Sequence, residues 1–238
     1  MRDIFFAHRQ IPGATKIAKM LTTPDRAVGR RIVSSIMQEN GWRSKVVKRY
    51  KATTDSKHKL PVAENVLNRV FTAQKPNEKW VSDVTYVQTD EGWLYTAAIV
   101  DLYGREVVGW AMDKRMQTSL VLDCLRQAQT RRGNPRGVLV HSDRGVQYCA
   151  HAYQKLLREC GHICSMSRKG NCYDNAPMES FWGKLKQEWL NGKRFRTRED
   201  AKRAIFWYIE VYYRSYRLHE SNGYVTPKEY GQTADCVA

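Results

Sequence analysis

At Trp80 the sequence changes from a basic, polar stretch to strand-like segments, and this change constrains the fold more than any other feature. Residues 80–88 (WVSDVTYVQ) and 93–101 (WLYTAAIVD) are rich in the β-branched and aromatic side chains that favour strands. A third segment of this kind, residues 105–112 (REVVGWAM), follows closely. Because only the short stretches TDEG and LYG separate the three segments, we predict an antiparallel meander.

After the meander, helical and strand-like segments alternate. Residues 116–132 are expected to form a helix, because Leu120, Cys124 and Ala128 share one face. Residues 137–143 (GVLVHSD) are short and almost wholly apolar, as expected of a buried central strand. The remaining expected elements are a helix at 150–160, a strand at 162–165, and helices at 175–190 and 198–216. This order predicts an α/β fold with a mixed five-stranded sheet flanked by helices.

The positive charge is concentrated near the N-terminus. The chain has a formal net charge of +16, and residues 1–60 contribute +10 of it, with 14 Lys/Arg against 4 Asp/Glu. Solubility does not require charge of one sign at one end of a chain. The distribution therefore favours nucleic acid as a partner over a merely solubilising surface.

Residues 1–42 are predicted to form a basic helical module. Residues 14–22 are the first expected helix. The second is expected to begin with Thr23 as its N-cap and Pro24 at its first position, and to end at Gly41.

In that second helix, Val28, Ile32 and Ile36 repeat at a spacing of four and predict one apolar stripe. Arg30 and Arg31 lie largely off this stripe. Two helices joined by a tight turn and rich in arginine suggest a helix-turn-helix-like DNA contact through Arg30 and Arg31. A small packing module without a DNA-binding role is the alternative.

The rest of the chain divides into three parts. Residues 43–75 are predicted to be a basic linker, whose stretch RSKVVKRYKATTDSKHK would follow a phosphate backbone non-specifically. Residues 76–232 form the predicted core with its C-terminal helix, and residues 233–238 a tail.

Other features narrow the class of protein. No apolar run approaches the roughly 18 residues that span a membrane, and we expect neither a signal peptide nor membrane binding. The expected location is therefore the cytoplasm. The six cysteines form no CxxC pair, and the cluster CGHIC lacks a second ligand pair, so we expect reduced buried thiols rather than a zinc site.

Three carboxylates fall where this fold could use them. Asp83 lies inside the first strand, Asp143 at the C-terminal end of the fourth, and Glu179 in the first turn of a long helix. If the first and fourth strands are neighbours, Asp83 and Asp143 converge, and the helix can bring Glu179 to them. Three carboxylates together repel one another, a cost that bound Mg²⁺ removes. Two such ions about 4 Å apart would flank a phosphate and suit phosphodiester chemistry.

Each acid also has a structural alternative. Asp83 could satisfy a local turn, Asp143 could cap the next turn, and Glu179 could complement a helix dipole. Asp174, just before the long helix, is interpreted as a cap or loop residue.

The sequence around all three acids resembles a known family. The motifs are WVSDVTY followed by GWLYTAAIVDLYGREVVGWAM, then HSDRGVQY, then SRKGNCYDNAPMESFWGKLKQE, with 35 residues between Asp143 and Glu179. They resemble the second-frame product of the two-frame, frameshifting bacterial insertion-sequence transposases, family three. The resemblance implies an integrase-like core with a ribonuclease-H fold, and an Asp-Asp-Glu triad at Asp83, Asp143 and Glu179 that holds two Mg²⁺ or Mn²⁺ ions.

The resemblance also implies DNA contacts. Lys186 stands seven residues after Glu179, at a position where the family has a basic residue. Seven residues are about two helical turns, so Lys186 is expected on the face of Glu179. Lys184 and Lys186 are accordingly expected to contact DNA beside the metal ions.

The implied activity is hydrolysis at the ends of an insertion element, followed by strand transfer. The implied partners are the terminal inverted repeats, target DNA and the product of the upstream reading frame, in an oligomer on DNA in the bacterial nucleoid. The tail YRSYRLHESNGYVTP departs from the family pattern at Arg214 and Asn222 but keeps Arg217 and His219. A DNA-binding regulator without transposition activity is the alternative, and a ribonuclease-H-type nuclease on RNA–DNA hybrids is a weaker one.

Overall fold

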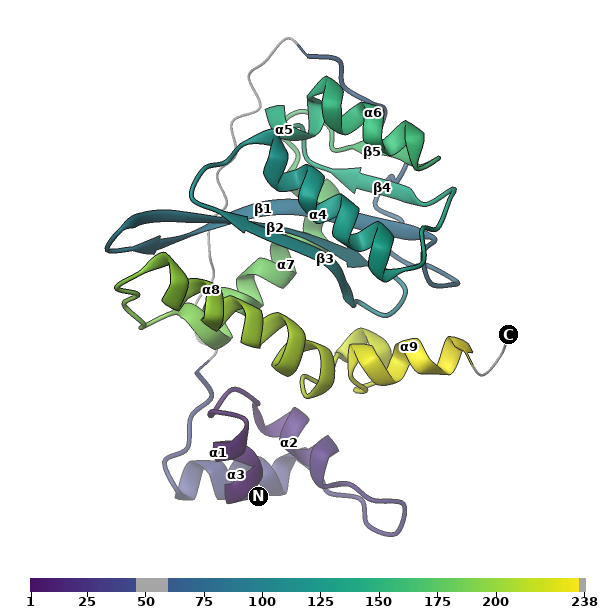
Figure 1. Cartoon of the computed structure of the whole chain (residues 1–238). Coiled ribbons are helices and arrows are strands. Elements are labelled where there is room, and N and C mark those ends of the chain that lie inside the picture. Colours follow the sequence, from purple (N-terminus) through teal and green to yellow (C-terminus); the bar gives the residue numbers. More distant parts are fainter. Residues whose placement is uncertain (46–59, 236–238) are drawn as a thin grey trace.

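A twisted sheet with helices on both faces forms the body of the protein (Figure 1). The computed structural model describes residues 1–45 and 60–235. The sheet has the order β3-β2-β1-β4-β5, and its strands are β1 Lys79–Thr89, β2 Gly92–Asp101, β3 Val107–Asp113, β4 Leu139–Ser142 and β5 Ile163–Met166. β1, β2 and β3 form the antiparallel meander, whereas β4 and β5 are parallel to β1. The predicted mixed five-stranded sheet is confirmed.

Two apolar layers enclose the sheet because side chains alternate along its strands. Trp80 packs towards α4 (Thr118–Arg131), α5 (Val146–Cys149) and α6 (His151–Glu159), and its neighbour Val81 packs towards the opposite layer. Gly109 lets α4 approach β3 closely, since an added Cβ would lie 2.8 Å from the Cβ of Ala128.

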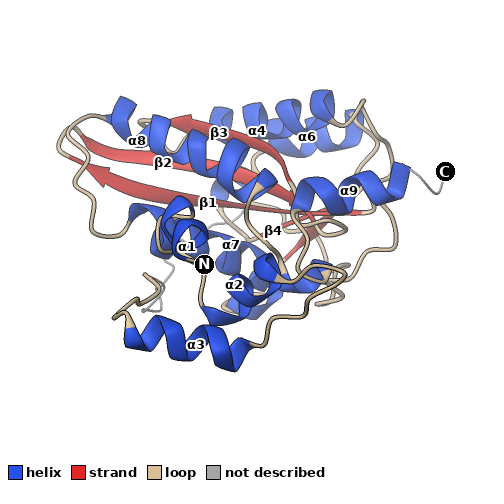
Figure 2. Ribbon diagram, turned by 90° about the horizontal axis from the view of Figure 1, so that it is seen from below, coloured by secondary structure: helices blue, strands red, loops and turns tan. Residues whose placement is uncertain are grey.

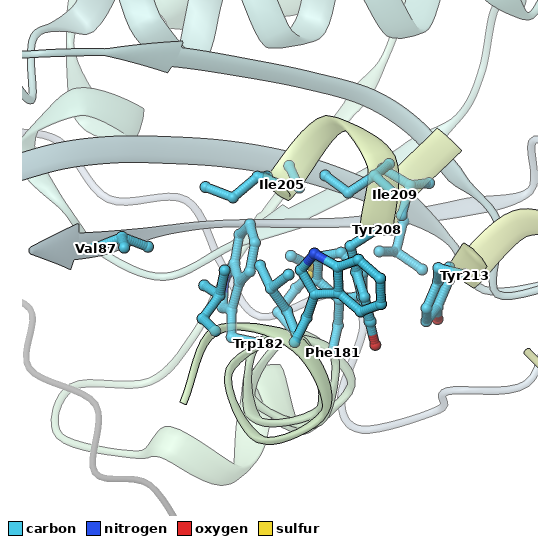
Figure 3. Packing of buried hydrophobic residues seen from close by; sticks show 14 of the residues in the cluster. Val87, Phe181, Trp182, Ile205, Tyr208, Ile209 and Tyr213 are labelled. Atoms are coloured by element: carbon cyan, nitrogen blue, oxygen red, sulfur yellow. The ribbon is translucent and has the colours of Figure 1, made fainter. Parts of the chain in front are cut away.

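The opposite layer is formed by α7 (Ala176–Leu185) and α8 (Arg198–Phe206). Figure 3 shows Phe181 and Trp182 of α7 gathered with Val87 of β1 and with Ile205. Both helices continue as π-helical segments, Lys186–Leu190 and Trp207–Tyr213. The long helices predicted at 175–190 and 198–216 are therefore present, with a wider turn in each.

Three helices precede the body: α1 Arg2–Ala7, α2 Ala14–Leu21 and α3 Arg30–Glu39. They lie together on the α7 side of the molecule (Figure 2). The predicted N-cap at Thr23 is wrong, because Thr23 and Arg26 exchange two backbone hydrogen bonds of 3.0 and 3.1 Å in a turn. α3 therefore begins after Gly29, and an eight-residue connection rather than a tight turn separates it from α2.

The predicted apolar stripe is also wrong. Val33 and Met37 are the buried residues of α3, and they pack with Phe5 and Ile17, whereas Ile32 is 62% exposed. The difference arises because α1, which the sequence pattern did not predict, supplies Phe5 and selects the face of α3 that is covered.

Residues 60–75 lie against the core, although they fall in the segment predicted to be a linker. Leu67 is fully buried, and its amide donates a 3.0 Å hydrogen bond to Ser165 Oγ. The stretch RSKVVKRYKATTDSKHK lies mostly outside the described residues.

The C-terminal part ends in α9 (Pro227–Asp235), an unpredicted helix that lies across the expected boundary between residues 232 and 233. Thr226 and Glu229 fix its start by reciprocal hydrogen bonds of 2.8 to 3.2 Å. Within residues 1–45 and 60–235, no helix is both long and apolar enough to cross a bilayer.

Candidate active site

Two aspartates meet where β1 and β4 run side by side. Val81 faces His141 in this parallel pairing. Asp83 lies two residues further along β1, and Asp143 follows directly after the end of β4 at Ser142. Asp83 therefore shares the sheet face of Val81, which α7 covers. Both carboxylates are half-buried, and Asp143 Oδ1 accepts a 2.8 Å hydrogen bond from the amide of Gly145.

Glu179 approaches the aspartates from the first turn of α7. The start of this helix is attached to β1, because Asn175 Nδ2 donates a 3.1 Å hydrogen bond to the carbonyl of Ser82. Met178 and Phe181 bury the adjacent face of the helix against the sheet. The side chain of Glu179 is half-buried, and the helix N-terminus favours its ionised form.

Electrostatics join the three acids. Burial raises the pKa of Asp83 well above its usual range, the neighbouring Asp143 carboxylate raises it further, and Glu179 adds a smaller increase in the same direction. Asp143 and Glu179 thus both repel the ionised form of Asp83, as carboxylates that share a site do.

The donor set of this site suits a hard divalent cation. Carboxylate oxygens are the ligands that Mg²⁺ prefers, and a cation would offset the repulsion that raises the pKa of Asp83. In the described part of the chain, no three His, Cys, Asp or Glu side chains are close enough together to hold one ion. The donor type therefore fits a divalent cation, whereas the described side chains do not form a ready three-ligand cluster for one.

Asp174, which the sequence indicated as a cap or loop residue, lies in the short 3-10 turn Cys172–Asn175 and does not cap α7. It is fully buried, and it accepts hydrogen bonds from the amide and guanidinium of Arg168 (2.8 to 3.0 Å), from Arg69 Nε (2.7 Å) and from Asn65 Nδ2 (2.9 Å). Hydrogen bonds from Arg168 hold the pKa of Asp174 well below its usual range. Asn175 is the N-cap residue of α7, without a side-chain cap bond. Asp174 instead joins the loop before α7 to residues 65–69.

Two buried residues support the aspartates, and the sequence analysis did not single them out. The Tyr148 hydroxyl lies 2.9 Å from Ser82 Oγ, and burial together with Asp83 raises the pKa of Tyr148 well above its usual value. His141 contacts Ser165 Oγ at 2.8 Å, and burial lowers its pKa to about 4. Both flank Asp143 in the motif HSDRGVQY, and this proximity was the signal that could have identified them.

The residues predicted to contact DNA lie in three different places. Lys186 is only 6% exposed, its Nζ is 5.4 Å from the ring centroid of Tyr86, and its charge interacts with Asp83. Lys184 donates a 2.8 Å hydrogen bond to Ser180 Oγ, and burial and Arg217 lower its pKa to about 8. The structure brings only Lys186 near the carboxylates.

Arg30 and Arg31 are exposed at the start of α3, on the N-terminal helices. They are thus part of a separate surface from the carboxylates.

Comparison with known proteins assigns this arrangement to a class. Two family models, each described as an integrase core domain, match residues 73–172 and 161–227. A simian T-cell lymphotropic virus intasome chain shares the fold with a TM-score of 0.54 at 15% identity, over 95% of this chain and 72% of that one. The HTLV-2 integrase catalytic core domain in complex with magnesium matches with a TM-score of 0.51 at 15% identity, over 67% of this chain and 99% of that one. The body of the protein is an integrase core with a ribonuclease-H-like fold.

Closer relatives give the family. The chain is 44% identical to the insertion element IS600 uncharacterized 31 kDa protein of Shigella sonnei, over 94% of this chain and 84% of the relative. It is 40% identical to the transposase InsF for insertion sequence IS3A of Escherichia coli (strain K12), over 95% of this chain and 78% of the relative. The chain belongs to the IS3 family of insertion-sequence transposases.

Proposed function

We propose that Asp83, Asp143 and Glu179 are the catalytic carboxylates of this protein. As a member of the IS3 family with an integrase core, the chain is a DNA transposase. The observation that carries the proposal is that Asp83 on β1 and Asp143 directly after β4 both follow the paired residues Val81 and His141 by two positions, while Glu179 stands in the first turn of α7. The proposal is supported by the effect of Asp143 and Glu179, which both raise the pKa of Asp83.

The three carboxylates would hold divalent cations, two Mg²⁺ or Mn²⁺ ions, as the magnesium complex of a related fold suggests. Such ions supply charge for the attacking and the leaving oxygen of an in-line displacement. The residues contribute rigidity: Tyr148 and Ser82 support β1, and the bonds of Asp174 fix the loop that leads into Glu179.

The reaction follows from these parts. Water is the attacking group in the first step, which breaks a phosphodiester at the element end and leaves a 3′-hydroxyl. That hydroxyl attacks a second phosphodiester in line, so one P–O bond forms as another breaks. Ser82 and Tyr148 lie near the acids but are buried and hydrogen-bonded to each other, so the proposal uses neither as a nucleophile and requires no covalent protein–DNA intermediate.

DNA binding is assigned to the basic parts of the chain. The substrates are the terminal inverted repeats and target DNA, and Arg30 and Arg31 on the 1–42 module contact the duplex. Lys184 and Lys186 act nearer to Glu179. The product of the upstream reading frame is the partner, as a fusion or a separate subunit, in an oligomer assembled on DNA in the nucleoid.

The test is cleavage and joining of labelled DNA that carries the element ends. Protein with and without the fused upstream frame is assayed with Mg²⁺, and Glu179→Gln is compared with Glu199→Gln, an exposed acid in the first turn of α8. We expect metal-dependent nicking and joining that only Glu179→Gln abolishes. Binding without cleavage, even by the fused protein, would refute the proposal and favour a regulatory role.

A further inference from the structure

An open hollow of about 460 Å³ lies away from the carboxylates, between the N-terminal helices and the π-helical segments of the core. Its larger lining residues are Arg9, Trp189, Lys193, Arg203 and Trp207. It combines two indoles with three cationic side chains, and no step of the transposase reaction described above uses them.

The indoles form a stacked pair. The rings of Trp189 and Trp207 are nearly parallel, with an interplanar angle of 6° and centroids 4.6 Å apart. Trp189 is buried, whereas Trp207 is 39% exposed and Phe206 beside it 48% exposed. The pair therefore leaves aromatic surface accessible to a planar ligand.

Two of the three cations, Arg9 and Lys193, lie against this stack with no carboxylate partner among the described residues, whereas Arg203 pairs with Asp200 at 2.6 Å. The Arg9 guanidinium carbon lies 4.2 Å from the ring centroid of Trp189, and Lys193 Nζ lies 4.4 Å from it. Neither forms an ion pair with any carboxylate in the described part of the chain. Burial lowers the pKa of Lys193, and the positive charges of Arg9 and Lys45 lower it further. Arg9 and Lys193 thus give the hollow positive charge that no carboxylate in the described part of the chain pairs with.

From this geometry we infer that the hollow binds an unpaired nucleobase of DNA, stacked on Trp207, with the flanking phosphates held by Arg9, Lys193 and Arg203. Aromatic stacking combined with a positively charged groove is how proteins hold single-stranded nucleic acid without reading its sequence. An apolar peptide would match the indoles but leave Arg9 and Lys193 unpaired. The charge complementarity therefore favours a polyanion with aromatic faces.

The position of the hollow suits DNA that also reaches the carboxylates. Trp189 is ten residues after Glu179 on one continuous helix, which corresponds to about 15 Å along its axis. That length is about four or five nucleotide steps of a DNA strand. The binding itself requires neither metal nor the assigned triad, so the inference can fail or hold independently of the proposed reaction.

The experiment measures the binding of a labelled twelve-nucleotide oligothymidylate by fluorescence anisotropy in the absence of metal. The same backbone with abasic sites serves as the second probe. Trp207→Leu is compared with Trp93→Leu, which removes another half-exposed indole (44%) from the far end of the β1–β2 hairpin. Trp207→Phe serves as the conservative variant, and melting curves establish that each variant is folded.

We expect Trp207→Leu to weaken binding of the thymidylate by at least about fivefold, with Trp207→Phe intermediate and Trp93→Leu unchanged. The abasic probe should bind all four proteins alike. Lys193→Gln should weaken both probes and reduce the salt dependence of binding by about one ion. Equal losses on the two probes, or no loss from Trp207→Leu, would overturn the inference. The inference would also be overturned if Trp207→Leu left DNA binding unchanged but abolished association with the upstream-frame product, because the hollow would then be a protein-docking surface.

Discussion

The buried ion pair between Arg217 and Glu188 should be a main determinant of stability. Three N···O contacts of 2.8 to 3.0 Å join the two side chains, which are 5% and 3% exposed. Tyr208 donates a further 2.8 Å hydrogen bond to Glu188. The pair links the extension of α7 to the chain that follows the last π-helical segment, so its loss affects two parts of the core.

The two partners are not equivalent, because further cations lie nearby. Lys16 and Lys184 both interact with Arg217 and with Glu188, and burial followed by repulsion from Arg217 lowers the pKa of each lysine to about 8. Glu188→Gln leaves Arg217 without its buried carboxylate. It also removes one of the two carboxylates, Glu188 and Glu220, that interact with Lys16 and Lys184. Arg217→Met leaves Glu188 with two remaining cations. We therefore expect Glu188→Gln to be the more destabilising change.

Breaking a buried pair by removing one partner costs about 3–5 kcal/mol. For a chain of this size 1 kcal/mol corresponds to roughly 2–4 °C, so Glu188→Gln should lower Tm by about 6–20 °C. The double variant Glu188→Gln/Arg217→Met should cost less than the sum of the single changes. Thermal and urea unfolding followed by circular dichroism measure these values.

An exposed ion pair provides the control. Arg126 and Asp123 are 60% and 63% exposed, so Arg126→Met should change the free energy of unfolding by less than about 1 kcal/mol. Losses below 1 kcal/mol for both buried single variants, or a larger loss for Arg217→Met than for Glu188→Gln, would refute the reasoning.

The same pair gives a pH dependence. Burial alone would raise the pKa of Glu188, but Arg217 outweighs it and holds the pKa below the usual range. A carboxyl group whose pKa is lowered by folding stabilises the protein at pH values above its unfolded pKa, which is near 4.3. This stability is lost as the pH falls through the pKa of the folded state. Glu188→Gln should remove this contribution, so that the free energy of unfolding depends less on pH in the acid range.

Three further outcomes are expected. Burial and the charge of Arg217 lower the pKa of His219 to about 2, so the unfolded chain binds one more proton below pH 6.5 and stability falls as the pH drops. Tm measured between pH 6.5 and 4 should therefore depend less on pH in His219→Gln, and an unchanged slope would exclude this contribution. Gly109→Ala should lower the free energy of unfolding by about 1–3 kcal/mol, because the added Cβ meets α4. Gly183 has open space around it, so Gly183→Ala should raise the free energy of unfolding by about 0.5 kcal/mol. Equal effects of the two variants in urea unfolding would contradict this. Mg²⁺ should raise the Tm of the wild type. Asp143→Asn should reduce this rise, and it should stabilise the metal-free protein because it relieves the repulsion on Asp83. An identical Mg²⁺ response in both proteins would remove Asp143 from the site.

The sequence was sufficient to predict the mixed sheet. It predicted that Asp83 and Asp143 converge only if the first and fourth strands are neighbours, and the structure shows that these strands pair. Strand propensity, short turns and one buried apolar strand determine which strands can be neighbours, and the register then follows. The N-terminal helices were harder, because the buried face of α3 depends on Phe5 of a distant helix.

Asp174 shows a second limit of sequence reasoning. Its partners, Asn65 and Arg69, are more than a hundred residues away along the chain, and no local pattern indicates that pairing. The hollow around Trp207 is similar, since Arg9 reaches it from the N-terminal helices. Local periodicity predicts elements, whereas contacts between remote segments require the folded chain.

The register between β1 and β4 has a consequence for how the protein acquires activity. Side chains alternate across a strand, so a slip of one residue would turn Asp83 into the layer that contains Trp80. Asp143 is also synthesised 60 residues after Asp83, on a strand that pairs with β1 only after α4 has crossed the sheet. A nascent or misregistered chain therefore cannot bring Asp83 and Asp143 together, and we predict that DNA cleavage by the proposed carboxylates begins only when the sheet is complete.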